Sequence, residues 1–217
     1  AYADGITESK VAEGFGKKAW TIVSPGVSIK PYPSGILTHQ SMDAMLKLVT
    51  DHNITADQVA SVEFYAGSNI LNPIRYAVAN DHLQAKFSMA ALLSMIVLNR
   101  RAGPKEFTNE FIRGAAAQDM QRRIRTHVDP DIESRGTDII RSRIELTTKD
   151  GRKLAQWADE RYRGGPSNPL SEADLRQKFA TCADGMLDAA RQARVIDAID
   201  RIETLTDAGS IAALIQP

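Results

Sequence analysis

The sequence predicts an α+β fold, in which a central unit of strands and helices is flanked at both ends by helical segments. Two observations support this prediction. Short runs in which apolar and polar residues alternate, typical of half-buried strands, all fall within residues 30–160. Apolar residues at three- and four-residue spacing, typical of amphipathic helices, occur around these runs without a regular strand–helix–strand rhythm.

The first quarter of the chain combines helices with a proline-stiffened loop. Residues 7–20 are predicted to form the end of a helix, although two glycines weaken its middle. Two prolines within Lys30–Gly35 exclude a regular helix and indicate an extended loop. From Thr38 onwards, helical spacing of apolar residues predicts an amphipathic helix, with Thr38 or Ser41 as its cap.

The middle of the chain holds the predicted strands, and the last 45 residues are predicted to be two or three helices. Strands are expected at residues 59–66, 124–128, 140–147 and 154–157, the last two joined by a turn at Lys149–Gly151. Helices are expected at 87–98, 104–113 and 115–122, the first of them apolar on all sides and therefore buried. A capping-box pattern at Ser171–Asp174 opens the C-terminal helices.

Composition describes an ordinary globular protein and argues against several classes of site. Of 217 residues, 27 are Lys or Arg and 27 are Asp or Glu, a balance unlike that of a nucleic-acid binder. The single cysteine, Cys182, forms neither an internal disulfide nor the thiolate set of an iron–sulfur cluster. No two histidines lie at metal-ligand spacing, so we expect no metal site.

The sequence gives no sign of a membrane segment. The longest apolar run, Met89–Leu98, has about ten residues, whereas a spanning helix needs about 20. No basic and apolar signal sequence opens the chain at Ala1. We therefore expect a cytoplasmic location and no membrane partner, with a removed leader or a missing upstream region left open.

Two segments concentrate groups that can bind anions. The segment Lys30–His39 places Lys, Tyr and His on a rigid loop before a helix, where they can present donors to a carboxylate. The alternative is an ordinary proline loop in which His39 only caps or packs. The basic run Arg122–His127 is interpreted as the solvated end of a helix and an edge strand rather than an anion site.

Three groups of motifs, in this order, resemble the C-terminal half of the MmgE/PrpD family. The first group is Gly14-Phe15-Gly16 with Trp20, followed by Lys30-Pro31-Tyr32-Pro33-Ser34 and Thr38-His39. The second is Ala85-Lys86-Phe87-Ser88-Met89. The third is Tyr162, Gly164, Pro166 and Asn168-Pro169-Leu170-Ser171, with Leu175 and Lys178-Phe179. The resemblance covers nearly the whole chain, whereas full members of the family are roughly twice as long.

The resemblance implies a division of the chain into three parts. Residues 1–24 are expected to be the end of a helical domain, residues 25–165 an α+β lid, and residues 166–217 helices that return to the helical domain. The expected partners are accordingly a second copy in a homodimer or a helical N-terminal half. No nucleic acid is expected among the partners.

The resemblance also implies an activity and candidate site residues. It predicts a lyase or isomerase that acts without a cofactor on a small di- or tricarboxylate, by removing a proton next to a carboxylate. Lys30 is the candidate for carboxylate binding or charge stabilisation, and His39 for proton donation or support of the loop. Tyr32, Lys86 and Ser88 are the candidate substrate-binding residues. For the last two, a solvated lysine and a helix cap are the competing interpretations.

Two residues depart from the pattern of the family. Ala91 stands where members often carry a tyrosine, and Gly35 stands where the dehydratases commonly carry a cysteine. A hydroxyl that could move protons is therefore absent at position 91. This departure supports a second hypothesis, a non-catalytic binding or assembly module or one subunit of a split enzyme.

Overall fold

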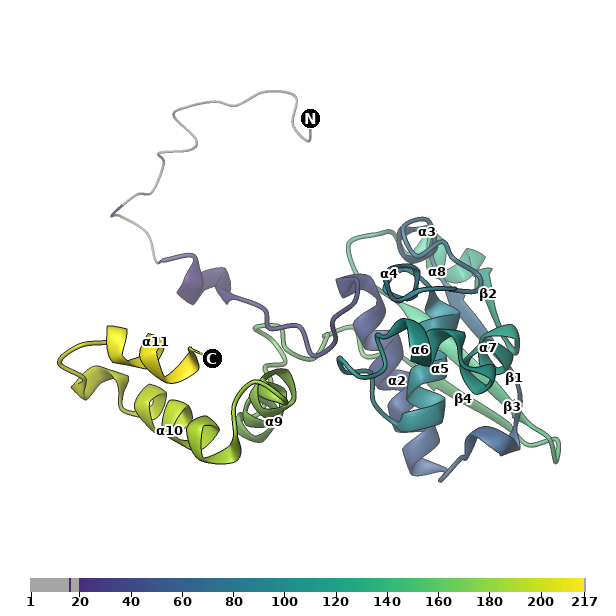
Figure 1. Ribbon diagram of the computed structural model, residues 1–217. Helices are drawn as coiled ribbons and strands as arrows, with labels where there is room; N and C mark the ends of the chain where they lie inside the picture. Colours follow the sequence, from purple (N-terminus) through teal and green to yellow (C-terminus); the bar gives the residue numbers. More distant parts are fainter. Residues whose placement is uncertain (1–15, 17–19, 217) are drawn as a thin grey trace.

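The computed structural model of the chain describes residues 16 and 20–216 and contains an α+β unit followed by a group of helices (Figure 1). The predicted α+β class is confirmed. The helix predicted at residues 7–20 falls almost entirely outside the described residues. The elements follow in the order η1 (Ile22–Gly26), η2 (Ile36–Thr38), α2 (His39–Asp51), η3 (Ala56–Gln58), β1 (Val59–Ala66), α3 (Ser68–Leu71), α4 (His82–Ala85), α5 (Met89–Asn99), α6 (Asn109–Arg113), α7 (Ala115–Arg122), β2 (Ile124–Val128), α8 (Pro130–Ser134), β3 (Ser142–Thr148), β4 (Lys153–Trp157), α9 (Glu172–Ala183), α10 (Ala189–Asp200), η4 (Ile202–Thr204) and α11 (Gly209–Ile215).

A four-stranded mixed sheet in the order β2-β1-β3-β4 forms the centre of the α+β unit. β1 pairs with β2 in parallel, while the β1–β3 and β3–β4 pairs are antiparallel. A parallel pair requires a crossover connection, which the segment containing α3 to α7 supplies. The sequence pattern does not reveal this crossover, because several short helices take the place of one long helix.

Helices α2 and α5 cover one face of the sheet. α2 packs against β3 and β4, and α5 packs against α2, α7 and β2. Within β1, the side chains of Val62, Phe64 and Ala66 are fully buried, and burial of a side chain such as Phe64 contributes about 2 kcal/mol. All residues of α5 from Met89 to Val97 are buried, which confirms the prediction of a buried helix. This core fixes the N-terminus of α2 and the loop that precedes it.

The opposite face of the sheet carries a polar and aromatic row across all four strands. His127, Tyr65, Arg143 and Trp157 are neighbours in register. The Tyr65 and His127 rings stack with centroids 5.1 Å apart, and the Arg143 guanidinium lies 4.3 Å from the Tyr65 centroid. β2 lies at the sheet edge and is exposed beyond its first residue, in agreement with the interpretation of the basic run at 122–127.

One predicted helix start and one predicted side-chain cap are corrected. The helix expected at 104–113 begins only at residue 109, because the Thr108 hydroxyl accepts the Phe111 N–H and caps it there. Thr38 occupies the N-cap position of α2, but its side chain makes no capping bond. Its hydroxyl donates instead to the Gly35 carbonyl at 2.8 Å. Thr38 therefore tightens the turn before α2.

The C-terminal helices α9, α10 and α11 form a small core of their own. Ala183, Leu187 and Val195 are buried there, with Phe179 and Leu214 packed against them. The predicted capping box at the start of α9 is present. Large apolar side chains stay exposed here and in the N-terminal segment, namely Trp20, Ile22, Val23, Val27, Leu175, Met186, Ile199, Ile202 and Ile215. Such exposure is typical of a surface that another element covers.

Two connections run side by side where the C-terminal helices leave the α+β unit (Figure 1). The Ile29 N–H donates to the Gly164 carbonyl at 2.8 Å, and the Ser28 and Tyr162 hydroxyls are hydrogen-bonded. Gly164 has φ +92°, and a Cβ atom there would overlap the Ile29 carbonyl oxygen. The close approach of the two connections therefore requires glycine at this position.

Candidate functional site

The loop before α2 presents Lys30 to solvent. This segment, residues 30–38, is called the Lys30 loop below. The Lys30 side chain is exposed, and its ammonium donates to the Ser34 carbonyl at 3.3 Å. The Ser34 and Thr38 hydroxyls lie 3.0 Å apart and are buried inside the loop. The loop therefore has a defined shape, while the Lys30 ammonium keeps donors available for a carboxylate.

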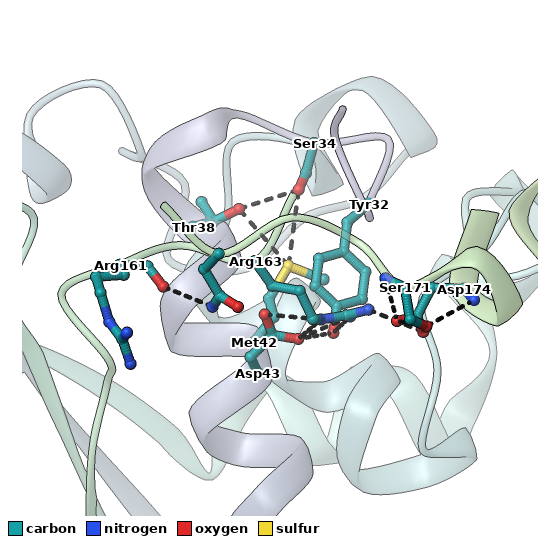
Figure 2. Close-up of polar contacts among 10 residues, drawn as sticks. Tyr32, Ser34, Thr38, Met42, Asp43, Arg161, Arg163, Ser171 and Asp174 are labelled. Carbon is teal, nitrogen blue, oxygen red and sulfur yellow. Dashed lines mark hydrogen bonds and ion pairs between the residues drawn. The ribbon is translucent and has the colours of Figure 1, made fainter. Parts of the chain in front are cut away.

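Tyr32 anchors the Lys30 loop in a network of polar contacts (Figure 2). Its buried hydroxyl donates to Asp43 Oδ1 at 2.6 Å. Arg163 Nη2 donates to the same Asp43 oxygen at 2.9 Å and to the Tyr32 hydroxyl at 3.3 Å. Burial, followed by the charge of Asp43, raises the pKa of Tyr32 above its ordinary value. The phenol therefore stays protonated and acts here as a structural donor.

His39, the first residue of α2, lies wholly inside the protein. Its side chain is 0% exposed, its ring packs edge-on against Tyr32 with centroids 5.5 Å apart, and neither ring nitrogen has a hydrogen-bond partner among the described residues. Burial is the largest cause that lowers the pKa of His39 to about 4. The imidazole is therefore neutral at pH 7.

The segment that carries Lys86 and Ser88 lies against the Lys30 loop. The Gly35 N–H donates to the Lys86 carbonyl at 3.5 Å. The Lys86 side chain is half-buried, and Ser88 is fully buried with its hydroxyl accepting the Ala91 N–H at 3.1 Å. The structure thus brings both predicted segments together, and it places Ser88 as the N-cap of α5.

Because Ser88 caps the buried helix α5, we expect Ser88→Ala to lower the free energy of unfolding of this chain by about 1 kcal/mol. Urea unfolding followed by circular dichroism measures this loss. Ser134→Ala is the matched control, because the exposed Ser134 hydroxyl donates to the Asp131 carbonyl and caps no helix. Equal stability of wild type and Ser88→Ala would contradict the capping role.

A concavity of about 470 Å³ borders the Lys86 segment. Arg75, Tyr76 and Phe87 are among its lining residues, and the Tyr76 N–H donates to the Phe87 carbonyl at 3.1 Å. Lys30 does not line this concavity. The open volume therefore borders the segment next to Lys86 rather than the Lys30 ammonium.

No helix within residues 16 and 20–216 combines the length and apolarity of a membrane span. In the same ranges, no cluster of three or more His, Cys, Asp or Glu side chains is arranged to hold a metal ion.

Two residues of the Tyr32 network, Asp43 and Arg163, are not among the candidates predicted from the sequence. Asp43 follows His39 by four positions and so lies on the same side of α2, a spacing that offered a local signal. Arg163 stands between Tyr162 and Gly164, both of which belong to the third group of motifs. Its partners are far away in the sequence, so no local pattern indicated its role.

Comparison with known proteins adds a family and two relatives. Residues 32–204 match the MmgE/PrpD C-terminal domain. Cis-aconitate decarboxylase of Mus musculus is 22% identical over 202 residues, which cover 91% of this chain and 41% of that protein. Cis-aconitate decarboxylase of Homo sapiens is 22% identical over 212 residues, which cover 95% and 43%. The chain thus spans less than half the length of these relatives.

Proposed function

The chain belongs to the MmgE/PrpD family, and we propose that it is the C-terminal domain of a lyase acting on small di- or tricarboxylates. The similarity to two decarboxylases supports lyase-type chemistry. The proposed reaction removes a proton next to a carboxylate. The electron pair left on carbon then expels hydroxide from the neighbouring carbon, which leaves as water, or in an isomerase it takes the proton back. In a decarboxylase the C–C bond to a carboxylate breaks, carbon dioxide leaves, and the remaining carbanion takes up the proton. No cofactor takes part.

One observation carries this proposal: Lys30 offers an exposed ammonium from a loop of defined shape. Carboxylate substrates need cationic donors, and charge that develops on a carboxylate during proton removal is stabilised by a donor already in place. The half-buried Lys86, on the segment that contacts this loop, would supply a second cation.

We assign structural roles next to Lys30 to the other candidate residues. The buried and neutral His39 favours the second of its two expected roles, support of the loop. Tyr32 is tied to Asp43 and Arg163, so we assign it to positioning rather than to direct substrate contact. Ser88 is assigned to capping of α5.

We further propose that the exposed apolar side chains of residues 20–27 and of the C-terminal helices pack on a helical domain. That domain would precede this one in a longer polypeptide, as the partial coverage of the relatives suggests. Association between two copies would bury the same kind of surface in a homodimer. A cytoplasmic location stays a prediction.

A second candidate function is a non-catalytic binding or assembly module. Ala91 favours it, because this side chain is fully buried in α5 and brings no hydroxyl to the site. On this view the chain binds a carboxylate or a partner subunit and converts nothing.

The test compares this chain with the complete polypeptide of its gene. Both are incubated with cis-aconitate, a citrate-like tricarboxylate and an aspartate-derived dicarboxylate, and products are followed by proton NMR and carbon dioxide release. We expect the complete polypeptide to convert at least one acid. Binding of an acid by the complete polypeptide without conversion would support the module instead.

A further inference from the structure

We propose that Arg163 is a positioning residue of the site, which ties the Lys30 loop to the first turn of α9. The inference rests on the function proposed above. Arg163 lies on the connection between β4 and α9, next to Gly164, whose carbonyl accepts the N–H of Ile29 just before the Lys30 loop. Among the described residues the Arg163 guanidinium has polar contacts with Tyr32, Asp43 and Asp174 and none with Lys30, so its effect on catalysis would pass through the loop.

The guanidinium of Arg163 joins three separate segments (Figure 2). Toward the α+β unit, its Nε and Nη2 atoms donate to the Asp43 carboxylate at 2.9 to 3.3 Å, and Nη2 also reaches the Tyr32 hydroxyl. Toward the C-terminal helices, Nη1 lies 3.5 Å from Asp174 Oδ1. One side chain therefore contacts α2, the Lys30 loop and α9.

Hydrogen bonds also fix the backbone next to Arg163 and its partner Asp174. The next residue, Gly164, accepts the Ile29 N–H, one residue before Lys30. Asp174 is fixed in turn, because its carboxylate accepts the Ser171 hydroxyl at 2.7 Å in the capping box of α9. A change in the angle between α9 and the α+β unit would therefore reach the Lys30 loop through Arg163.

The chemistry of this position suits arginine and not lysine. The planar guanidinium presents several N–H donors in a fixed fork, so it can bind Asp43 with two nitrogens and still reach Asp174. Although burial acts in the opposite direction, the hydrogen bond and charge of Asp43 raise the pKa of Arg163, so the group stays charged. A lysine ammonium keeps the charge but cannot reproduce the fork.

Hydrogen exchange of this chain tests the positioning role without any substrate. We expect Arg163→Gln to speed exchange of the amides in residues 32–43 by about tenfold, the effect of losing one charge-assisted pair. Arg163→Lys should give a smaller increase. Arg161→Gln is the matched control from the same connection, since within the described part of the chain the Arg161 side chain pairs only with the exposed Asp159. Unchanged exchange in Arg163→Gln would overturn the proposal.

Kinetics of the complete polypeptide test whether Arg163 acts through Lys30. We expect Arg163→Gln to lower kcat/KM by about tenfold, Arg163→Lys to restore part of it, and the double variant Lys30→Ala/Arg163→Gln to match Lys30→Ala alone. If the fall in kcat/KM of the double variant equals the product of the two single falls, Arg163 does not act through Lys30. If the wild-type polypeptide converts no acid, the proposed function fails, while hydrogen exchange still decides whether Arg163 positions the loop.

Discussion

Lys30→Ala in the complete polypeptide is expected to lower kcat/KM by about 10²- to 10³-fold, the usual effect of removing a donor that stabilises developing charge. The physical reason is the placement of Lys30. Its ammonium is exposed on a shaped loop and makes one hydrogen bond, to the Ser34 carbonyl, among the described residues. The loss should appear for each acid that the wild-type polypeptide converts.

The fold should survive this substitution. Tyr32, Asp43 and Arg163 hold the loop, and Lys30 adds a single hydrogen bond of 3.3 Å to the Ser34 carbonyl, so we expect the free energy of unfolding to change by less than about 0.5 kcal/mol. The matched control is Lys47→Ala, which removes an exposed lysine of α2 that pairs with Asp51. Wild-type turnover in Lys30→Ala, or an equal loss in Lys47→Ala, would contradict the assigned role.

Local pattern was sufficient to predict most of the fold. β1 and β2 occupy the predicted residues 59–66 and 124–128, because alternation in a strand directly reflects which side chains face the core. The capping box of α9 could also be predicted, because its partners, Ser171 and Asp174, are three residues apart. The parallel pairing of β1 and β2 could not be predicted, since periodicity indicates which side chains of a strand face the core and not which strand lies next to it.

The site was predictable only in part, for the same reason. Lys30 and the residues around it form one continuous motif, so the sequence placed them together. Arg163 and Asp43 are 120 positions apart, and only the folded chain brings them together. The sequence left the burial of His39 open, because a histidine at the start of an amphipathic helix has the same local pattern whether it packs inward or faces solvent.

The buried His39 predicts a pH dependence of stability. Its pKa is about 4 in the folded protein, against about 6.5 when the chain is unfolded. Between these values the unfolded chain holds a proton that the folded chain does not, so the free energy of unfolding decreases as the pH falls. The stabilising contribution is complete above pH 6.5 and is lost progressively towards pH 4, by about 3 kcal/mol in total.

Replacement of the imidazole isolates this contribution from that of the carboxylates. We expect wild type to lose about 2 kcal/mol more stability than His39→Leu between pH 7 and pH 4.5, measured by urea unfolding at each pH. His52→Leu is the matched control, because it removes an exposed histidine just beyond the end of the same helix and should keep the wild-type fall. The same fall in wild type and His39→Leu would show that the His39 ring gains a proton in the folded protein as easily as in the unfolded chain. That outcome would favour proton donation over loop support as the role of His39, because a ring that titrates near neutral pH can exchange protons with a substrate.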